Sequence, residues 1–262
     1  MKLEGIRVVI TGANSGIGRA ILTELVKLEG TRILAVDLRV DNIPELPTIK
    51  TWVADLSSAE GTDSTVRVAE AWLGGIDLYF ANAGYAHYEE LGGPDWEKLR
   101  KIFNTNVLTG MYTFQKVREA AAGRPFRVVL TASAMAYLPI PGYAVYGATK
   151  ASLVSFAEAV RFGLADPCSL TLLNPIATRT AFFQHATSTA PTPFPSQRPE
   201  QVAKRVVRAL RHDKRDIFPS RLFRLMLAAR PFLPRSLRLY QKWQQLILTR
   251  WQRSQNSQSA PR

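Results

Sequence analysis

The stretch Arg7-Val8-Val9-Ile10-Thr11-Gly12-Ala13-Asn14-Ser15-Gly16-Ile17-Gly18 decides the fold of this chain. Its first five residues have the apolar, β-branched composition of a buried strand, and an amphipathic helical pattern follows at 19–28. A strand, a glycine turn and a helix start in this order direct backbone N–H groups and the positive end of a helix dipole to one point. The sequence therefore predicts a diphosphate-binding turn at the start of a dinucleotide-binding sheet.

The three glycines of this turn have different expected roles. Gly12 permits the tight turn, Gly16 lets the backbone approach a phosphate, and Gly18 lets the helix pack closely on the strand. An ordinary glycine-rich turn is the alternative that this spacing alone leaves open. The candidate cofactor-binding residues of the turn are Thr11, Gly12, Asn14, Ser15, Gly16, Ile17 and Gly18.

An acidic residue follows the second predicted strand. Asp37 lies 19 residues after Gly18, where a carboxylate accepts hydrogen bonds from the ribose hydroxyls of an adenosine. A 2′-phosphate would be repelled there, and Ser15 occupies the position before Gly16 where a basic residue would bind that phosphate. Both features favour NAD over NADP, whereas Arg39 is the residue that could favour NADP.

Short apolar runs alternate with amphipathic helical patterns as far as about residue 175. We expect strands at 7–11, 31–36, 49–54, 76–81, 127–131 and 170–174, a helix at 199–212 and a short seventh strand at 216–218. The runs are apolar on both faces, which is typical of a parallel sheet covered by helices on both sides. The sequence predicts a single α/β domain of the doubly wound, Rossmann type over 1–218, with a long substrate loop at 176–199.

Composition narrows the class of protein further. The chain has 262 residues, 46% of them hydrophobic, which is enough for a substantial core. The single cysteine, Cys168, allows no intrachain disulfide and too few thiols for a structural zinc site, so we expect no metal and a reducing compartment. No signal peptide precedes the first strand, and no run of about 18 apolar residues is present. We expect a cytoplasmic protein, or one bound peripherally to the cytoplasmic face of a membrane.

Five further motifs follow the glycine turn in a fixed order: Asp55-Leu56, Asn82-Ala83-Gly84, Asn106, Ser133 and Tyr146-Gly147-Ala148-Thr149-Lys150. With that turn, the chain as far as about Phe218 resembles the short-chain dehydrogenase/reductase family. The resemblance implies a nicotinamide cofactor, assembly into a homo-dimer or homo-tetramer, and a catalytic set of Asn106, Ser133, Tyr146 and Lys150. It also implies cofactor contacts from Asp55, Leu56, Asn82, Ala83, Gly84, Tyr146, Lys150, Pro175, Ile176 and Thr180.

The residue types of the catalytic set suit hydride transfer. Oxidising an alcohol requires a group that removes the hydroxyl proton, and the Tyr146 phenol can do this if its pKa falls from about 10 toward neutrality. Lys150 lies one helical turn later, so its positive charge is expected to lower that pKa. The resemblance further implies that Lys150 binds the nicotinamide ribose, Ser133 holds the substrate oxygen and Asn106 organises a water-mediated proton path.

Each of these residues also has a purely structural interpretation. Tyr146 and Lys150 could be ordinary neighbours on a helix, Ser133 could cap a turn, and Asn106 could fit a helix irregularity. The joint set favours an NAD-dependent oxidoreductase acting on CH–OH donors, in either direction between alcohol and ketone. The alternatives are a cofactor-binding scaffold that recognises a lipid or a partner, and an epimerase or dehydratase of the same fold.

One position departs from the family pattern. The segment Asn174-Pro175-Ile176 has isoleucine where the family commonly has glycine after the proline. Isoleucine resists a positive φ, so we expect the chain to follow a different path over the nicotinamide. The cofactor contacts assigned to Ile176 and Thr180 depend on that path.

The positive charge of the chain is concentrated in a C-terminal extension, 219–262. Residues 1–197 contain 18 basic and 18 acidic side chains, whereas 198–262 contain 16 and 3, and no acid follows Asp216. Apolar residues recur at helical spacing between basic ones, at Leu237, Tyr240, Trp243, Ile247 and Trp251. Such a helix suits an anionic membrane surface through 220–253, or it packs this stripe on the protein itself.

The membrane interpretation favours an apolar substrate such as a long-chain alcohol, a sterol or a retinoid. Nucleic-acid binding is disfavoured because no recognisable module accompanies the charge. Residues 254–262 are expected to be disordered because most of them are polar.

Overall fold

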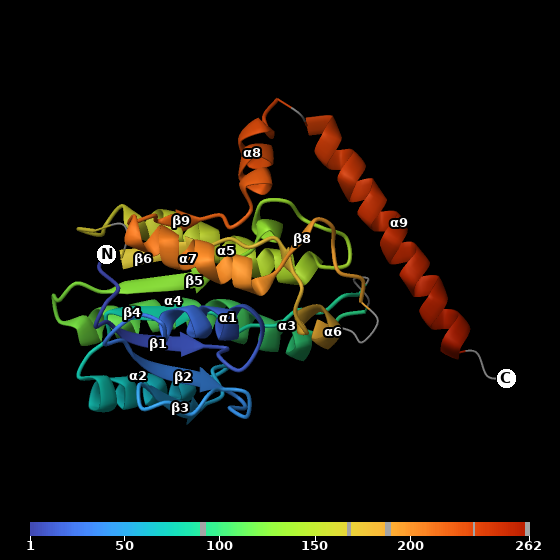
Figure 1. Ribbon diagram of the computed structural model, residues 1–262. Helices are drawn as coiled ribbons and strands as arrows, with labels where there is room; N and C mark the ends of the chain where they lie inside the picture. The colour runs from blue at the N-terminus through green and yellow to red at the C-terminus, as the bar shows by residue number, and fades with distance from the viewer. Residues whose placement is uncertain (90–92, 167–168, 187–189, 233, 260–262) are drawn as a thin grey trace.

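A seven-stranded, all-parallel sheet covered by helices on both faces forms the body of the molecule (Figure 1). The computed structural model describes residues 1–89, 93–166, 169–186, 190–232 and 234–259, so Cys168 lies outside the described residues. The strand order is β3-β2-β1-β4-β5-β6-β9. The predicted doubly wound, Rossmann-type fold is therefore confirmed. The strands are β1 (Arg7–Thr11), β2 (Arg32–Asp37), β3 (Ile49–Val53), β4 (Leu78–Ala81), β5 (Arg127–Thr131), β6 (Leu170–Leu173) and β9 (Asp216–Ile217).

The helices occupy the positions that parallel crossovers require. They are α1 (Gly16–Leu25), α2 (Ala59–Leu73), α3 (Trp96–Phe103), α4 (Thr109–Ala121), α5 (Ala144–Arg161) and α7 (Pro199–Arg211), with a π-helical turn at Asn104–Leu108 and a 3-10 turn at Ala134–Ala136. On β1, Val8 and Ile10 pack toward α1 and α7, whereas Val9 packs toward α2, α4 and α5. Each buried aliphatic side chain of this kind contributes about 1.5–3 kcal/mol, so the strand is fixed from both sides.

One strand differs from the predicted pattern of burial on both faces. β3 is the edge strand and pairs only with β2. Lys50, Thr51 and Val53 are exposed because no neighbouring strand and little helix surface cover that edge. The prediction of full burial was wrong for this strand and correct for β1, β2, β4, β5 and β6, which lie inside the sheet and are largely buried.

The order of the strands reverses between β1 and β4. From β1 the chain adds β2 and β3 on one side, then crosses back to place β4 on the other side of β1. Because all strands are parallel, their carboxyl ends lie at one edge of the sheet, and the reversal leaves a crevice there. The sequence motifs follow these carboxyl ends, so the fold gathers them at one place.

The segment 176–199 was expected to be a loop without regular structure, and this is wrong in part. It contains the short strands β7 (Ala177–Thr178) and β8 (Ser196–Gln197) and the helix α6 (Phe182–Ala186), while 187–189 lie outside the described residues. The two strands pair in parallel, and the amide of Arg179 donates to the carbonyl of Gln197 at 2.9 Å. These backbone bonds hold the two ends of the segment side by side, at 177–178 and 196–197.

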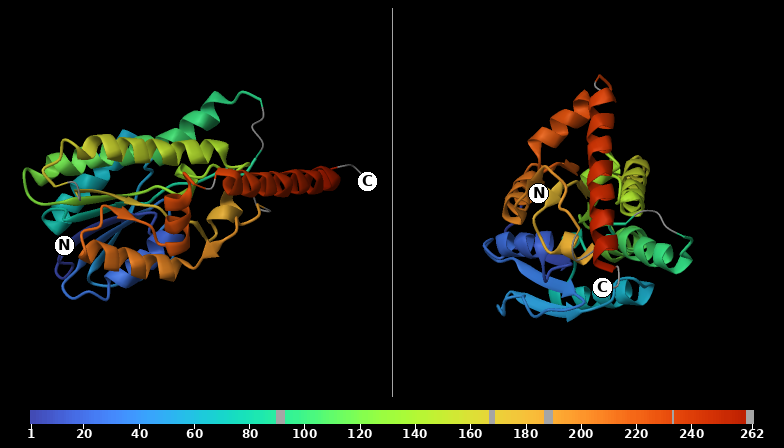
Figure 2. Two further views of the ribbon diagram at one scale, coloured as in Figure 1. Left: turned by 90° about the horizontal axis from the view of Figure 1, so that it is seen from above. Right: turned by 90° about the vertical axis from the view of Figure 1, so that its right-hand side faces the viewer.

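The C-terminal extension forms two helices, α8 (Arg221–Ala229) and α9 (Pro234–Ser259). Figure 2 shows α9 crossing the end of the molecule to which the strands point. The expected disorder was wrong for 254–259, which continue α9, and 260–262 lie outside the described residues. No glycine or proline interrupts 235–259, so nothing in the sequence breaks the helix there. No helix among the described residues combines the length and apolar character needed to span a membrane.

Candidate active site

The glycine turn has the geometry that its sequence predicts. Gly12 and Gly16 have φ values of 65° and 56°, which a side chain would make unfavourable. A Cβ atom on Gly18 would overlap the carbonyl oxygen of Gly12, so α1 can approach β1 this closely only without one. α1 begins at Gly16 with Ser15 as its N-cap, and the Ser15 hydroxyl makes no capping bond. The free amides at this helix start face the crevice at the end of β1, a fitting cradle for a diphosphate.

Asp37 stands at the end of β2 beside this turn. Its carboxylate accepts hydrogen bonds from the backbone amides of Asn14 at 2.9 Å and Leu38 at 2.7 Å. Arg39 points its guanidinium at Asp41 instead, with N–O distances of 3.2 and 3.0 Å. The Arg39 charge is thus already paired, and the group that faces the glycine turn is the carboxylate of Asp37.

A hydrogen-bond network joins the end of β1 to the end of β4. The Thr11 hydroxyl donates to the carbonyl of Phe80 and accepts from the amides of Asn82 and Ala83, at 3.0 to 3.1 Å. The Asn82 side chain donates to the Thr11 carbonyl at 3.1 Å and accepts from the Thr131 hydroxyl at 3.2 Å. Thr11, Asn82 and Ala83 therefore fix the floor of the crevice.

The pair Asp55-Leu56 follows the edge strand β3. Asp55 is exposed and accepts a bond from the Ser57 amide at 2.9 Å, whereas Leu56 is buried and its carbonyl accepts from the Thr109 hydroxyl. The Ala54 amide donates to the Asp37 carbonyl at 3.2 Å, so the pair lies next to the carboxylate of Asp37 along the same edge. The structure brings these residues together on the side of the crevice where the sequence predicts an adenine.

Three of the predicted catalytic residues meet at the carboxyl end of β5. Tyr146 and Lys150 lie on α5 and are 8% and 4% exposed, and the Lys150 Nζ atom lies 5.7 Å from the centroid of the Tyr146 ring. Lys150 donates to the Thr131 carbonyl at 2.8 Å. Ser133 is also buried, accepts from the Met135 amide at 3.1 Å, and is hydrogen-bonded to the Tyr146 hydroxyl. Serine, tyrosine and lysine thus form one compact group.

Burial dominates the electrostatics of this group. It raises the pKa of Tyr146 to about 12, although the bond to Ser133 acts in the opposite direction. Burial also lowers the pKa of Lys150 to about 8. In the chain alone Lys150 does not bring the pKa of Tyr146 below 10, because the loss of hydration outweighs a cation that lies beside the ring. The expected lowering also involves an oxidised nicotinamide, which the chain alone does not test.

The lowered pKa of Lys150 has a measurable consequence for stability. Between about pH 8 and pH 10.5 the unfolded chain binds more protons at Lys150 than the folded chain. The destabilisation that the buried lysine causes therefore decreases as the pH rises through that window. We expect Lys150→Met to raise the melting temperature of the cofactor-free protein most below pH 8 and progressively less toward pH 10.5. The pH-dependent part of this gain in the free energy of unfolding is about 3 kcal/mol.

The measurement is thermal unfolding of both proteins across this window. The lost bond to the Thr131 carbonyl lowers stability equally at every pH, so the pH dependence isolates the charge. Lys204→Met, at an exposed site on α7, is the control and should show no such trend. A Lys150→Met effect that is constant over the window would contradict the assignment.

Asn106 lies in the π-helical turn between α3 and α4. Its side chain accepts from the Tyr85 amide at 3.0 Å and donates to the Tyr85 carbonyl at 2.8 Å and to the Thr149 hydroxyl at 3.2 Å. A Cβ atom on Gly84 would lie 2.9 Å from the Asn106 oxygen and 3.5 Å from the Lys150 amine. The π-helical turn therefore directs Asn106 toward Gly84 and Lys150. This position is compatible both with a fit to the helix irregularity and with the expected role in a proton path.

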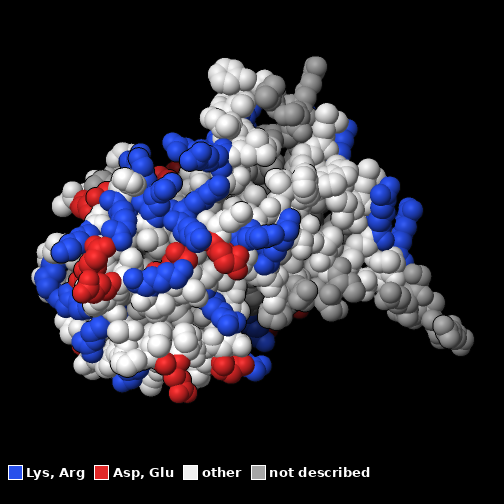
Figure 3. Space-filling view, in the orientation of Figure 1, with Lys and Arg blue, Asp and Glu red and all other residues white. Residues whose placement is uncertain are grey.

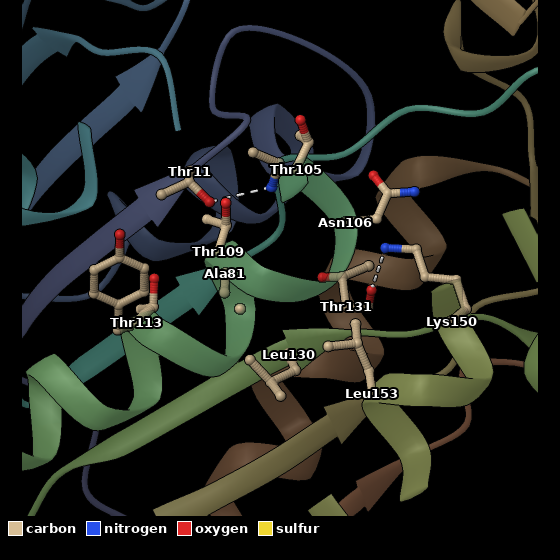
Figure 4. A pocket seen from close by; sticks show the side chains of 13 residues that line it. Thr11, Ala81, Thr105, Asn106, Thr109, Thr113, Leu130, Thr131, Lys150 and Leu153 are labelled. Carbon is tan, nitrogen blue, oxygen red and sulfur yellow. Dashed lines mark hydrogen bonds between the residues drawn. The ribbon is translucent and has the colours of Figure 1, made fainter. Parts of the chain in front are cut away.

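A small cavity of about 10 Å³ adjoins these groups. Figure 4 shows the Lys150 amine beside Asn106, with its bond to the Thr131 carbonyl. The volume suits about one water molecule, and the threonine, asparagine and lysine groups around it supply polar partners.

The segment after β6 places Pro175, Ile176 and Thr180 in three different surroundings. The Pro175 carbonyl accepts from the Ala134 amide at 2.9 Å, which ties the ends of β5 and β6 together. Among described non-glycine residues, only Ala122 and Asp213 have a positive φ, so Ile176 keeps an ordinary conformation. A Cβ atom on Gly16 would lie 3.4 Å from the Thr180 methyl group, so Thr180 packs over the glycine turn. Thr180 is thus beside the predicted diphosphate, and Ile176 lines an adjoining pocket.

That pocket is apolar, has a volume of about 170 Å³ and reaches Ser133. Phe194 of the 176–199 segment lines it, whereas Phe182 and Phe183 do not. The C-terminal helices α8 and α9 contribute much of its wall, through Phe223, Met226, Tyr240 and Trp243. The lining residues are Ser133, Ala134, Met135, Leu138, Ile140, Ile176, Ala177, Pro193, Phe194, Pro195, Phe223, Met226, Tyr240 and Trp243.

An aromatic cluster covers the other side of Tyr146. Phe182 lies 5.6 Å and Tyr143 6.4 Å from the Tyr146 ring, between ring centroids, and both pairs meet edge to face. The Tyr143 hydroxyl is buried without a hydrogen-bond partner in the described part of the chain. Phe182 and Phe183 therefore shield the tyrosine from water, and this role could have been suspected only from their aromatic character.

No cluster of three or more His, Cys, Asp or Glu side chains suited to a metal ion occurs among the described residues. The titratable groups placed along the crevice are the carboxylates of Asp37 and Asp55, the Tyr146 phenol and the Lys150 amine.

Comparison with known proteins places this site in a family. The sequence profile described as short chain dehydrogenase matches residues 7–191. An uncharacterized oxidoreductase of Myxococcus xanthus is 30% identical over 165 residues, which are 60% of this chain and 65% of that protein. Estradiol 17-beta-dehydrogenase 11 of Macaca fascicularis is 26% identical over 80% of this chain and 73% of its own length.

Solved structures show the same fold. A short-chain dehydrogenase/reductase from Burkholderia phymatum, solved in complex with NAD, has a TM-score of 0.78 at 19% identity, and the match covers 89% of this chain and 95% of that one. A short-chain dehydrogenase from Burkholderia cenocepacia, solved in complex with NADP, has a TM-score of 0.77 at 19% identity over 90% and 97% of the two chains. The matched profile covers well over half of the sequence, and this chain belongs to the short-chain dehydrogenase family.

Proposed function

We propose that this protein transfers a hydride between NAD(H) and an apolar alcohol or the corresponding ketone, with Tyr146 as general acid and base. The observation that carries the proposal is the apolar pocket of about 170 Å³ whose wall includes the Ser133 side chain next to Tyr146. Relatives named estradiol 17-beta-dehydrogenase 11, epidermal retinol dehydrogenase 2 and farnesol dehydrogenase support an apolar substrate.

The crevice fits a nicotinamide dinucleotide. The positive φ values of Gly12 and Gly16 leave backbone room at a helix start, which suits the diphosphate, and Thr180 borders the same turn. Asp37 is placed for the adenosine ribose, with Asp55 and Leu56 beside the adenine. The contacts assigned to Asn14, Ser15, Ile17, Asn82, Ala83, Gly84, Pro175 and Ile176 complete the proposed cofactor site.

The chain's own groups can then carry the proton. When bound, the nicotinamide ring supplies the hydride acceptor or donor. Ser133 donates a hydrogen bond to the substrate oxygen, while the Tyr146 oxygen removes the hydroxyl proton of an alcohol or returns one to a ketone. The oxidised ring and the Lys150 ammonium both favour the ionised phenol, which offsets the effect of burial on the pKa of Tyr146. Asn106 would hold a water in the small cavity, and that water would pass the proton onward.

The test is cofactor reduction with a series of straight-chain primary and secondary alcohols. We expect kcat/KM to rise with chain length until the alkyl chain fills the pocket. Net reduction of the cofactor would also separate this activity from epimerisation or dehydration, which leave the cofactor unchanged overall. Tight NADH binding without turnover of any alcohol or ketone would instead support a cofactor-binding scaffold.

The preference for NAD is a separate prediction. NADH should bind more tightly than NADPH, because Asp37 repels a 2′-phosphate while Arg39 is paired with Asp41. Asp37→Ser should reduce the ratio of the two affinities by about tenfold, which corresponds to about 1.4 kcal/mol of binding free energy. Energy transfer from the tryptophans to the reduced nicotinamide measures both affinities. A wild-type preference for NADPH would show that Arg39 outweighs Asp37.

We also infer a homo-dimer or homo-tetramer paired through α5. The support is the exposed end of that helix, where Phe162 is 95% exposed, together with exposed Leu108 in the neighbouring π-helical turn. Sedimentation equilibrium of the wild type and of Phe162→Asp checks this inference. A monomeric wild type would contradict it.

A further inference from the structure

The C-terminal helix α9 uses the apolar stripe seen in its sequence to pack on the protein body. Gln244 and Leu248 are 4% and 3% exposed, and Trp251 lies 4.9 Å from the ring of Tyr88, between centroids. The Tyr240 hydroxyl donates to the Phe194 carbonyl at 2.7 Å. The side chain of Leu237 lies outside the described residues. α9 therefore packs on the body through Tyr240, Gln244, Leu248 and Trp251, whereas Trp243 of the stripe stays 43% exposed.

Trp243 and further apolar side chains on α8, on α9 and at Phe232 between the two helices are exposed. Of the fourteen large apolar side chains that are exposed in the described chain, six belong to 222–246, although this segment is a small part of the sequence. We call this set, with the basic residues between its members, the tail surface. Its apolar members are Leu222, Leu225, Phe232, Leu239, Trp243, Leu246 and, on the adjoining segment, Phe194.

The tail surface adjoins the apolar pocket through Phe194 and Trp243. Phe223 and Met226 of α8 and Tyr240 and Trp243 of α9 line the pocket, so it lies between the two helices. Trp243 is 43% exposed while it lines the pocket, so the pocket reaches the surface beside it. The exposed apolar area is thus continuous with the site that would bind an apolar substrate.

The charge of the tail surface is of one sign. No acidic residue follows Asp216. In Figure 3 the part of the molecule formed by α9 shows Lys and Arg at its edge, uncharged side chains and no Asp or Glu. The exposed basic residues are Arg221, Arg224, Arg230, Arg238, Lys242, Arg250 and Arg253. Basic and apolar side chains interleaved on one surface match an anionic bilayer, which offers phosphate groups above an apolar interior.

We propose that the tail surface binds an anionic phospholipid bilayer and that the pocket receives its alcohol or ketone from that bilayer. A second copy of the chain is a poorer occupant, because two tail surfaces of the same positive sign would repel each other. The delivery of substrate rests on the proposed function, whereas binding to the bilayer does not.

The test is co-sedimentation of the full-length protein with vesicles of phosphatidylcholine, with or without phosphatidylserine. We expect binding that requires phosphatidylserine. Arg238→Gln with Lys242→Gln should weaken it by about 30-fold, since each basic residue near an anionic surface contributes about fivefold. The matched control is Lys204→Gln with Arg208→Gln, which removes two exposed charges at the same i, i+4 spacing on α7 and should have little effect.

Apolar insertion is tested separately. Leu239→Ser with Leu246→Ser should weaken vesicle binding without loss of charge. Bromine-labelled phospholipid should quench the tryptophan fluorescence of the wild type and of Trp96→Phe, but much less that of Trp243→Phe. Trp96 is the matched control because it is 76% exposed on α3, outside the tail surface.

The outcomes separate the two proposals. Equal binding to both kinds of vesicle, absence of binding, or an equal loss in the α7 control would overturn the bilayer proposal. Absence of binding would leave an acidic protein as the occupant of the tail surface. Turnover of a water-soluble short-chain alcohol should be unchanged in the Arg238→Gln, Lys242→Gln protein. Vesicle binding as expected without any alcohol turnover would reject the proposed function alone.

Discussion

Replacing Tyr146 by phenylalanine is expected to lower kcat by about a thousandfold while leaving the affinity for NADH nearly unchanged. The substitution removes only the hydroxyl that carries the proton. The ring stays in its cluster, where Phe182 and Tyr143 pack edge to face against it. General acid–base catalysis contributes between about a hundredfold and ten thousandfold, so the effect should exceed those of the cofactor and vesicle variants.

The neighbouring tyrosine provides the control for this experiment. The Tyr143 hydroxyl is buried without a partner among the described residues, so Tyr143→Phe should keep turnover and leave stability equal or slightly higher. Steady-state kinetics and NADH titration of both variants make the comparison. Retained turnover in Tyr146→Phe, or an equal loss in Tyr143→Phe, would remove Tyr146 from its assigned role.

Local sequence patterns predicted the sheet well because its strands are fixed by local composition. β1 and β5 begin and end where expected, at Arg7–Thr11 and Arg127–Thr131, since apolar runs there are bounded by a glycine turn and polar segments. β3 has a similar composition but lies at the edge. Whether a strand is central or at the edge depends on strand order, which a single run does not encode.

The site was predicted to a similar extent. The positions of Tyr146, Lys150 and Ser133 follow from motif order, because the parallel sheet gathers strand ends at one edge. Their pKa values do not follow, because the opposite shifts of Tyr146 and Lys150 arise from burial by α6 and by the body of the protein. Spacing along a helix gives proximity, and burial is a property of the whole fold.

The C-terminal extension shows a similar limit. Periodicity predicted a helix with the stripe Tyr240, Trp243 and Trp251, and α9 is such a helix. The pattern did not say that Tyr240 and Trp251 would contact the body, or that Trp243 would stay exposed while it lines the pocket. An amphipathic helix encodes that one face is apolar but not which surface that face will meet.

Replacing Gly18 by alanine is expected to weaken NADH binding by about a hundredfold, as a displacement of about 1 Å in a binding group can do. An alanine Cβ would overlap the carbonyl oxygen of Gly12 and come within 2.8 Å of the Asn82 amide nitrogen. The first contact is with backbone, so the glycine turn itself must move away from α1. The amides at the start of α1 would then no longer face the position assigned to the diphosphate.

Two opposing effects decide the stability of this variant. Alanine favours a helix over glycine by about 0.5–1 kcal/mol, whereas overpacking against fixed backbone costs about 1–3 kcal/mol or more. The clash should win, so Gly18→Ala should lower the free energy of unfolding in chemical denaturation. Gly93→Ala is the matched control, because a Cβ atom there would meet nothing within 4 Å. If Gly18→Ala bound NADH like the wild type, the turn could not be the diphosphate site, and the remaining assignments along β1 and β2 would lose their anchor.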